Sequence, residues 1–281
     1  ISLLLGFTIY LSTIGIKTDK FNSRIISEIK KIEPNLELKL TEVSAKLNPF
    51  KLEVKATTIG TNLLYKDKLI KLESIKSNIS LKSFLNDNFA ITKILISTRS
   101  LGIKDLIIFA RLFNNDPKLF IANQFIKRGF VVADIKLSFD KSGNIKSNYK
   151  INLVINDGQI NLFKKYDLNK INFKLKIDEK KLEFDNVKFL LNNNNILVPE
   201  LIMLKENSEY SISGKLDTKN TNLSKKDISN LANDEILKLD FDNIVFNSKN
   251  NFKFKIDKKF KIKNLDIKSD INIEKFNVKN T

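Results

Sequence analysis

The chain has 281 residues, of which 42% are hydrophobic, so it is long enough to bury a sizeable core. It contains no Cys, His or Trp, which excludes disulfides and thiolate metal sites and removes the commonest general base and the commonest metal ligand. We therefore expect no enzyme activity, no metal and no cofactor.

The formal net charge is +17, with a pI near 9.7. A basic balance is compatible with nucleic acid or anionic lipid as a partner. Only four of the 49 basic residues are arginine, however, and the 32 acidic residues are interspersed among the lysines. Because base readout relies on arginine, and nucleic-acid binding on a clustered basic stripe, we expect no nucleic-acid partner.

Residues 1–16 (ISLLLGFTIYLSTIGI) carry no charge and precede Lys17. A helix of this length would span about 24 Å, short of a hydrocarbon thickness of about 30 Å. Because the sequence starts with Ile1 and stops at Thr281 within a periodic stretch, we expect a piece of a longer protein, cut inside its first helix. A signal peptide or a buried helix is the alternative, but residues 12–15 are a poor cleavage site. We favour a single transmembrane anchor over residues 1–16.

Residues 17–103 are expected to hold a short amphipathic helix followed by a first β segment. Apolar residues recur at helical spacing before Pro34, at Phe21, Ile25, Ile29 and Ile32. From Leu36 the spacing changes to two, and similar alternating runs continue to Ile96. This alternation predicts half-buried strands.

Residues 104–129 interrupt the alternation and predict a pair of helices. The first is expected over residues 105–113. The second is expected to begin near Asp116-Pro117 and to end in Lys127-Arg128-Gly129, since cations and then glycine favour a helix C-terminus.

Residues 130–281 predict a long antiparallel β meander that continues beyond Thr281. Turns are expected at residues 140–144 and at Asn156-Asp157-Gly158, a strong hairpin signal. Changes of phase, such as that between Phe184 and Val187, predict bulges. A helical turn is expected over residues 225–231. The strands expected after the hairpin are residues 171–177, 182–191, 197–203, 210–216, 237–246, 252–256 and 262–278.

The apolar side of such a sheet must be covered. A closed sandwich that packs its own core is one possibility. The meander lacks an evident closing element, and its helices are too few to cover it. We therefore expect a mainly β protein whose long curved antiparallel sheet forms a groove for another molecule. Period-two phase assigns the following residues to the groove lining: Ile135, Leu137, Phe139, Ile151, Leu153, Ile155, Phe173, Leu175, Ile177, Phe189, Ile212 and Leu216.

The order of anchor, short helix, β segment, helical pair and meander resembles the AsmA-like family, relatives of the bridge-like lipid-transfer proteins of bacterial envelopes. Residues 135–160 (IKLSFDKSGNIKSNYKINLVINDGQI) are especially similar, with Phe139-Asp140, Gly143, Tyr149 and Asp157-Gly158 in the expected order. The resemblance implies a single-pass inner-membrane protein whose bulk lies in the periplasm. Its implied partners are phospholipid acyl chains, the inner membrane and outer-membrane components.

Two functions follow as expectations. The first is a hydrophobic β-groove that carries phospholipid towards the outer membrane. The second is a structural scaffold that assists outer-membrane protein assembly by pairing its exposed strand edges with client strands.

Overall fold

The computed structural model describes residues 2–278 except residues 20, 21, 24, 25, 27–29, 31–33, 41, 66, 67, 87–89, 114–116, 163–165, 192, 193, 207, 208, 230–240 and 258–260. The four apolar positions of the predicted amphipathic helix lie outside the described residues. The elements are α1 (Ser2–Thr13), β1 (Ile16–Thr18), β2 (Leu36–Lys39), β3 (Val43–Asn48), β4 (Glu53–Ile59), β5 (Asn62–Tyr65), β6 (Lys68–Ser80), α3 (Leu81–Leu85), β7 (Ile91–Thr98), β8 (Leu101–Gly102), α4 (Ile103–Phe113), α5 (Pro117–Phe125), β9 (Ile126–Ser138), β10 (Lys150–Leu162), β11 (Tyr166–Ile177), β12 (Lys181–Leu191), β13 (Asn194–Glu206), β14 (Glu209–Ser224), α6 (Lys225–Ser229), β15 (Phe241–Ile256) and β16 (Ile262–Val278).

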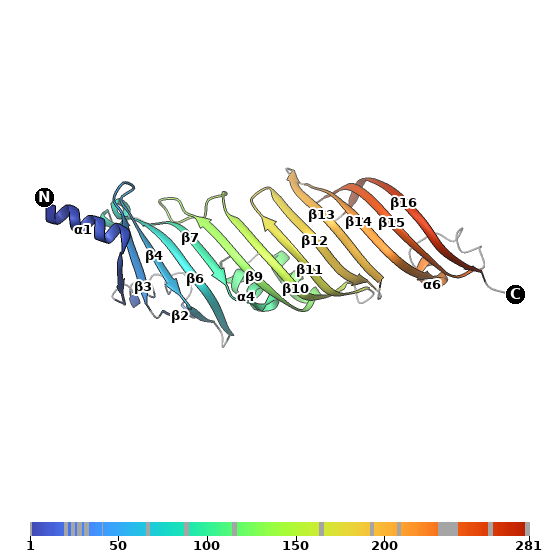
Figure 1. Ribbon diagram of the computed structural model, residues 1–281, viewed down its shortest axis with the longest axis horizontal. Helices are drawn as coiled ribbons and strands as arrows, with labels where there is room; N and C mark the ends of the chain where they lie inside the picture. The colour runs from blue at the N-terminus through green and yellow to red at the C-terminus, as the bar shows by residue number, and fades with distance from the viewer. Residues whose placement is uncertain are drawn as a thin grey trace. The chain divides into compact units, whose positions relative to one another are not determined.

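The described chain is mainly β, as expected, and its strands form one 16-stranded antiparallel sheet (Figure 1). The strand order is β1-β3-β4-β6-β7-β9-β10-β11-β12-β13-β14-β15-β16, with β5 joining β2 to β6 and with β8 paired to β9. The chain divides into two compact units. Unit 1 comprises Ile1–Gln124, Phe130–Val154 and Ile177–Glu179, and unit 2 comprises Phe125–Gly129, Ile155–Lys176 and Lys180–Thr281.

Unit 1 has a densely buried core. The long strand β6 has different partners along its length. Its first residues, Lys68–Lys71, pair with β5, and its later residues pair with β4 on one side and β7 on the other. Alternation in β2 buries Leu36 and Leu38 and leaves Glu37 and Lys39 exposed. Val43, Leu72 and Val131 are at most 1% exposed, so unit 1 contains a core that is sealed from water.

Helix α1 is shorter than the predicted anchor. Gly15 has φ of 77°, and a Cβ there would lie 2.5 Å from the Ala45 carbonyl oxygen, so a glycine is needed where the chain leaves the helix. The Lys46 ammonium donates to the Thr13 carbonyl at 2.7 Å. The next residues, from Ile16, form β1 against β3 instead of continuing the helix. Among the residues described, no helix combines the length and the apolar character needed to cross a membrane.

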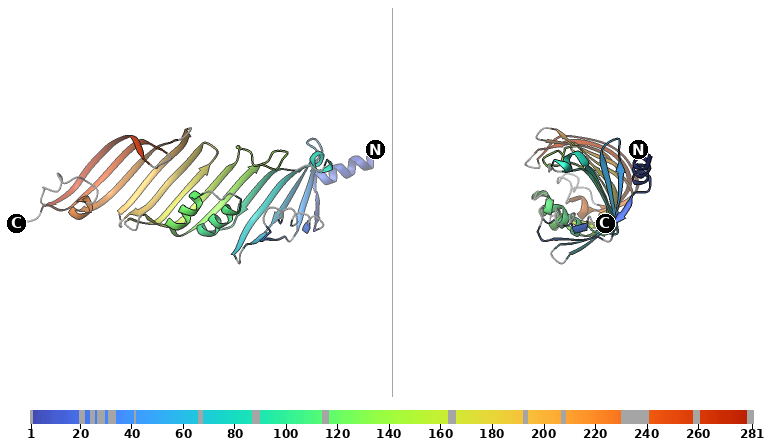
Figure 2. Two further views of the ribbon diagram at one scale, coloured as in Figure 1. Left: turned by 180° about the vertical axis from the view of Figure 1, so that it is seen from behind. Right: turned by 90° about the vertical axis from the view of Figure 1, so that its left-hand side faces the viewer.

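The helical pair is present, but its second helix ends earlier than predicted. Helices α4 and α5 lie on one side of the sheet (Figure 2). Lys127, Arg128 and Gly129 belong to β9, which begins at Ile126, so their prediction as a helix end is wrong. Gly129 has φ of 138°, a conformation that glycine supplies within a strand as well as at a helix end.

The predicted hairpin at residues 156–158 is also wrong, because β10 runs through it without a turn. Asp157 has φ of 48°, and its amide donates to the Asn172 side chain at 3.1 Å. A Cβ on Gly158 would lie 3.1 Å from that of Ile171, so the glycine permits close approach of the neighbouring strand. The left-handed residue that favours a hairpin turn here lies within a continuous strand.

The remaining predicted strands and the helical turn are present in unit 2, with one merger. Residues 237–240 lie outside the described chain, and the two strands predicted for residues 237–246 and 252–256 are one strand, β15. The predicted turn at residues 140–144, in unit 1, is confirmed: the Asp140 amide donates to the Asn144 carbonyl at 3.0 Å. The strand predicted for residues 262–278 is β16.

Candidate functional site

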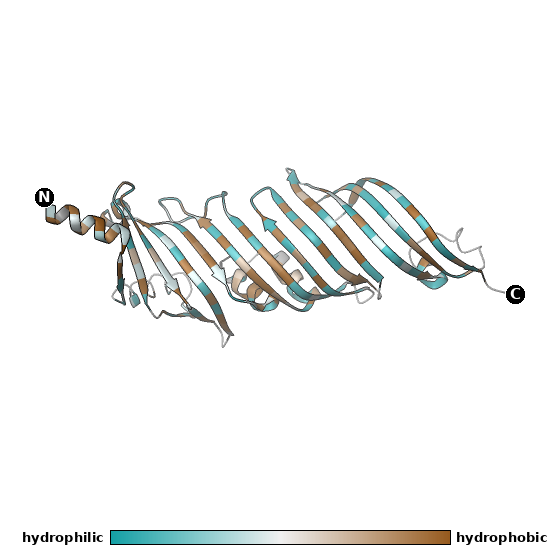
Figure 3. Ribbon diagram, in the orientation of Figure 1, coloured by the Kyte–Doolittle hydropathy of each residue, from teal (hydrophilic) through white to brown (hydrophobic). Residues whose placement is uncertain are grey.

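The candidate site is a face of the unit 2 sheet on which apolar side chains of neighbouring strands stand opposite one another. Residues directly opposite in an antiparallel pair lie on the same face, so the register defines rows across the strands. One row is Leu182, Met203, Ile212 and Phe254; the next is Phe184, Leu201, Gly214, Phe252 and Ile267; another is Phe189, Ile196, Thr218, Ser248 and Ile271. We call this side the apolar face. Figure 3 shows the alternation of hydrophobic and hydrophilic residues along these strands.

The apolar face continues where the sequence changes phase. Leu182 and Phe184 have even numbers, whereas Val187 and Phe189 have odd ones, and Asn186 between them has φ of 52°. Val187 stands opposite Val198, which is 7% exposed. The β12–β13 register continues unbroken past Asn186, and the register shift lies between Leu197 and Leu201, where β13 pairs with β14. The phase change thus accompanies a left-handed residue on β12, and the irregularity in pairing lies on the neighbouring strand.

The predicted lining residues of unit 2 lie on this one side. The Phe173 and Phe184 rings are 5.6 Å apart between centroids, which joins β11 to the rows. Ile212 and Leu216 lie on the same face of β14 as Gly214, and Ile212 is 5% exposed. The buried residues Leu175 and Ile155 complete the predicted set of this unit.

The remaining predicted residues belong to unit 1. Ile135 and Leu137 of β9 stand opposite Ile96 and Ile94 of β7. Phe139 lies just after β9, in an isolated bridge with Ile145. Ile151 and Leu153 are half-buried and alternate with exposed residues of β10, while Ile177, also half-buried, ends β11.

Several residues of the apolar face were missing from the sequence-based set. Ile171 and Val198 are 4% and 7% exposed, and Phe252 stands opposite Gly214. Ile171 shares the phase of Phe173, so the alternation was a sufficient signal for it. Val198 and Phe252 follow phase changes, and their side can be assigned only from the register.

Much of the apolar face is open to water at its last described strand. Ile267, Ile271 and Ile273 of β16 are 55%, 57% and 58% exposed. At the α6 end, Phe241 is 1% exposed, its ring lies 5.4 Å from that of Phe276, and the Lys225 ammonium lies 6.0 Å from its centroid. Since Phe276 stands opposite Ile244, α6 lies on the apolar face.

The opposite face of the same strands carries charges of both signs. One row there is Lys188, Leu197, Asp217, Lys249 and Asp270. A cleft of about 630 Å³ is lined by these residues together with Phe189, Ile196, Thr218 and Ser248 of the apolar face. Because lysine and aspartate alternate along the row, the cleft shows no strong preference for an ion of either sign.

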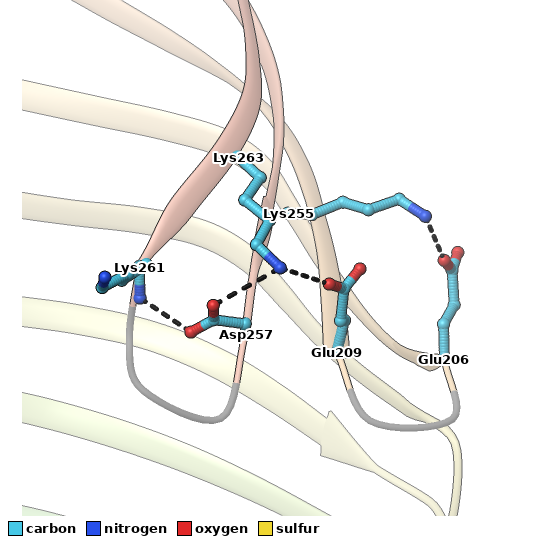
Figure 4. Close-up of polar contacts among 6 residues, drawn as sticks. All are labelled: Glu206, Glu209, Lys255, Asp257, Lys261 and Lys263. Atoms are coloured by element: carbon cyan, nitrogen blue, oxygen red, sulfur yellow. Dashed lines mark hydrogen bonds and ion pairs between the residues drawn. The ribbon is translucent and has the colours of Figure 1, made fainter.

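Ion pairs also cluster at the β13–β14 and β15–β16 hairpin ends (Figure 4). Lys255 Nζ lies 2.8 Å from Glu206 Oε2, and Lys263 Nζ lies 2.9 Å from Glu209 Oε1 and 3.4 Å from Asp257 Oδ2. Hydrogen bonds to Glu206 and Glu209 raise the pKa of Lys255 and of Lys263, respectively. We call this group of paired residues the charged rim of unit 2. Because the pairs are exposed to solvent, they add little stability.

Within the described part of the chain, no group of three or more acidic side chains is placed to hold a metal ion. No protein-family model matches the chain, and no curated protein matches it. One solved structure, that of P47 from Clostridium botulinum A2, is 13% identical over 89% of this chain and 79% of that chain, with a TM-score of 0.14. A similarity at that TM-score carries no argument about fold or function.

Proposed function

We propose that the apolar face of unit 2 forms a groove that takes up the acyl chains of phospholipid, in a protein that carries lipid from the inner towards the outer membrane. The observation that carries the proposal is two rows without polar side chains, from Leu182 of β12 to Phe254 of β15 and from Phe184 of β12 to Ile267 of β16. Ile267, Ile271 and Ile273 of β16 are more than half exposed. Exposed apolar patches of this kind mark binding surfaces for apolar partners.

The physical argument is the cost of exposing an acyl chain. Burying one CH₂ is worth about 0.8 kcal/mol, so transferring a sixteen-carbon chain through water costs on the order of 10 kcal/mol. A continuous apolar path removes most of this cost without chemistry. Such a role requires no catalytic group, which is consistent with a chain that lacks His and Cys.

The proposed location rests on α1 and on the resemblance to the AsmA-like family. Leu3, Leu5 and Phe7 of α1 are 86%, 61% and 59% exposed, and the helix carries no charge. Apolar side chains exposed on an uncharged helix favour a membrane as its surroundings. We propose that this segment contributes to an inner-membrane anchor and that the strands lie in the periplasm.

The direct test is lipid content. The protein expressed in bacteria and purified in mild detergent should retain phospholipid that mass spectrometry detects. Protein that is consistently free of lipid, with all its apolar side chains protected from solvent labels, would contradict the proposal.

Two charge substitutions, made separately, test the path. Leu175→Asp tests the apolar face of unit 2, and Leu153→Asp tests the predicted lining of unit 1. Each places a carboxylate among apolar side chains, where an unpaired charge costs several kcal/mol. Folded protein that no longer binds lipid supports a groove; unfolded protein supports a sealed core. Lys174→Asp and Val154→Asp are matched controls on exposed neighbouring residues of the same strands and should leave lipid content unchanged.

A scaffold for outer-membrane protein assembly is the second candidate. Strand β16 is long and exposed throughout, and in the described chain it pairs only with β15. An unpaired strand edge can accept another strand. Photocrosslinkers at Lys268 and Asp270 that capture nascent outer-membrane strands, in protein free of lipid, would favour this candidate over lipid transfer.

A further inference from the structure

A polar strip interrupts the apolar face on β14 and β15. Its members are Thr218, Thr221, Ser248 and Asn250, which the register places on the same side as Phe252 and Phe246. On β12 and β13 the corresponding middle of the face is apolar, with Val187 opposite Val198. The strip is therefore a local feature of the last described strands.

The strip is an ordered hydrogen-bonded group. Asn250 Nδ2 donates to the Leu216 carbonyl at 3.0 Å and to Ser248 Oγ at 2.8 Å, which uses both amide protons. Thr218 Oγ1 and Ser248 Oγ lie 3.0 Å apart. One of these two hydroxyls donates to the other, and the proton of the second remains free to bond a further acceptor.

Thr221 adds a second hydroxyl with unused capacity. It is only 4% exposed, and its Oγ1 has no hydrogen-bond partner among the residues that the structure describes. Buried polar groups of folded proteins nearly always have a partner, since leaving one unpaired is destabilising. A bound molecule that brings polar oxygens to the strip would supply the partner that Thr221 Oγ1 lacks among the described residues.

Most apolar residues of β14 to β16 form two lanes, one on each side of the strip, while Leu216 and Ile271 stand opposite Asn250 and Ser248 within it. The first lane holds Ile212, Phe252, Phe254 and Ile267, and the second holds Leu223, Ile244, Phe246, Ile273 and Phe276. Phe246 and Phe252 are six residues apart on β15, which corresponds to about 20 Å along an extended strand. A single hydrocarbon chain crossing between the lanes would pass over hydroxyl and amide groups.

We propose that the strip binds the polar centre of a two-chain lipid, its ester and phosphate oxygens, while one acyl chain lies in each lane. This inference rests on the proposed function and goes beyond it, because it assigns the register of the lipid and the residues that select it. A purely apolar hydrocarbon would leave the hydroxyls unsatisfied and should bind less well.

The test compares two probes on the full chain: 1-palmitoyl-2-oleoyl phosphatidylglycerol and squalene, in direct competition. The wild type should prefer the phospholipid. The triple variant Thr218→Val, Ser248→Ala, Asn250→Leu should lose roughly five-fold in that preference for each hydrogen bond to the lipid that it removes. Asn251→Leu, on the opposite face beside Asn250, is the matched control and should keep the wild-type ratio.

Single variants keep the test decisive if the triple variant fails to fold. Thr218→Val, which is nearly isosteric, should lower the preference, and Thr218→Ser should retain it; a merely structural hydroxyl would change stability without changing the ratio. An unchanged ratio in folded Thr218→Val and Thr221→Val, or a wild type that binds squalene equally well, overturns the inference alone. A wild type that binds neither probe overturns the proposed function as well.

Discussion

Units 1 and 2 show the same alternation of apolar and polar residues, yet they differ in what covers the apolar side. In unit 1, β2, β5 and α4 contribute the buried side chains Leu36, Leu63 and Phe109. In unit 2, the helix between β14 and β15 has five residues, and Ile271 remains 57% exposed. Alternation therefore identifies the side chains that share a face, whereas the presence of covering elements decides whether that face is a core or a surface.

The largest expected effect comes from placing the same charge at a buried position of unit 1 and at an exposed position of unit 2. Leu72→Asp replaces a side chain that is 1% exposed, so it should lower the free energy of unfolding of unit 1 by at least about 4 kcal/mol and prevent its folding. Ile271→Asp should cost less than about 1 kcal/mol, because the aspartate remains hydrated. Circular dichroism during urea unfolding measures both. Equal losses from the two substitutions would show that unit 2 is sealed in solution.

Much of the fold could be predicted where a simple period persists. Strand β16 matches its predicted bounds, because apolar residues recur through Ile262–Val278 with no turn signal, although the alternation changes phase near Asn264 and near Glu274. The turn at Asp140 was predictable because a short carboxylate can accept from Ser142 and Asn144 amides, as it does here at 2.8 and 2.9 Å.

The sequence-based predictions fail where the same local residues are compatible with two different backbone structures. Asp157-Gly158 suits a left-handed turn, but here the Asp157 amide donates to the Asn172 side chain and the strand continues. Residues 247–251 lack apolar alternation, so the sequence predicted a break in what is one strand, β15; pairing with β14 and β16 holds the backbone there regardless of the side chains. That stretch holds Ser248 and Asn250 of the polar strip, which apolar periodicity could not assign to the site.

The second prediction asks whether the apolar face is tightly packed even where it is uncovered. A Cβ on Gly214 would lie 2.7 Å from the Glu200 carbonyl oxygen and 2.8 Å from Phe252 Cζ. Gly214→Ala should therefore lower the free energy of unfolding by about 1–3 kcal/mol. Adding Phe252→Leu should recover part of the loss, since the ring can be shortened but the backbone carbonyl cannot move freely. A neutral Gly214→Ala would show that β13 and β14 separate easily.

The third prediction concerns α6, which covers one end of the apolar face. The Asp227 carboxylate accepts from the Ser224 amide at 3.0 Å and from its hydroxyl at 2.5 Å, and the Asp227 amide donates to Ser224 Oγ at 3.2 Å. These bonds form a capping box, so Asp227→Ala should cost about 1 kcal/mol.

The same bonds lower the pKa of Asp227, the side-chain hydrogen bond from Ser224 contributing most. A lowered pKa in the folded state means that the stabilisation is present above the unfolded pKa of about 3.9 and is lost as pH falls through the folded value. Asp227→Asn should therefore flatten the acid limb of stability between about pH 5 and pH 2, measured by urea unfolding at each pH. An acid limb identical to that of the wild type would exclude this role for Asp227.

The smallest expected effect is at the charged rim of unit 2. The hydrogen bond to Glu209, followed by that to Asp257, raises the pKa of Lys263. A raised pKa in the folded state means that the stabilisation is present below the ordinary lysine value of about 10.4 and is lost as pH rises through the folded value.

Because the Lys263 side chain is 48% exposed, its pairs are screened by solvent and salt. At pH 7 and about 0.15 M salt, Lys263→Met should thus leave the unfolding temperature within error of the wild type, as should Lys268→Met on the same strand. In low salt above about pH 10, the wild type should lose stability more steeply than Lys263→Met, whereas Lys268→Met should follow the wild type. A large loss from Lys263→Met at neutral pH would instead place the rim, and not the apolar face, among the features that hold unit 2 together.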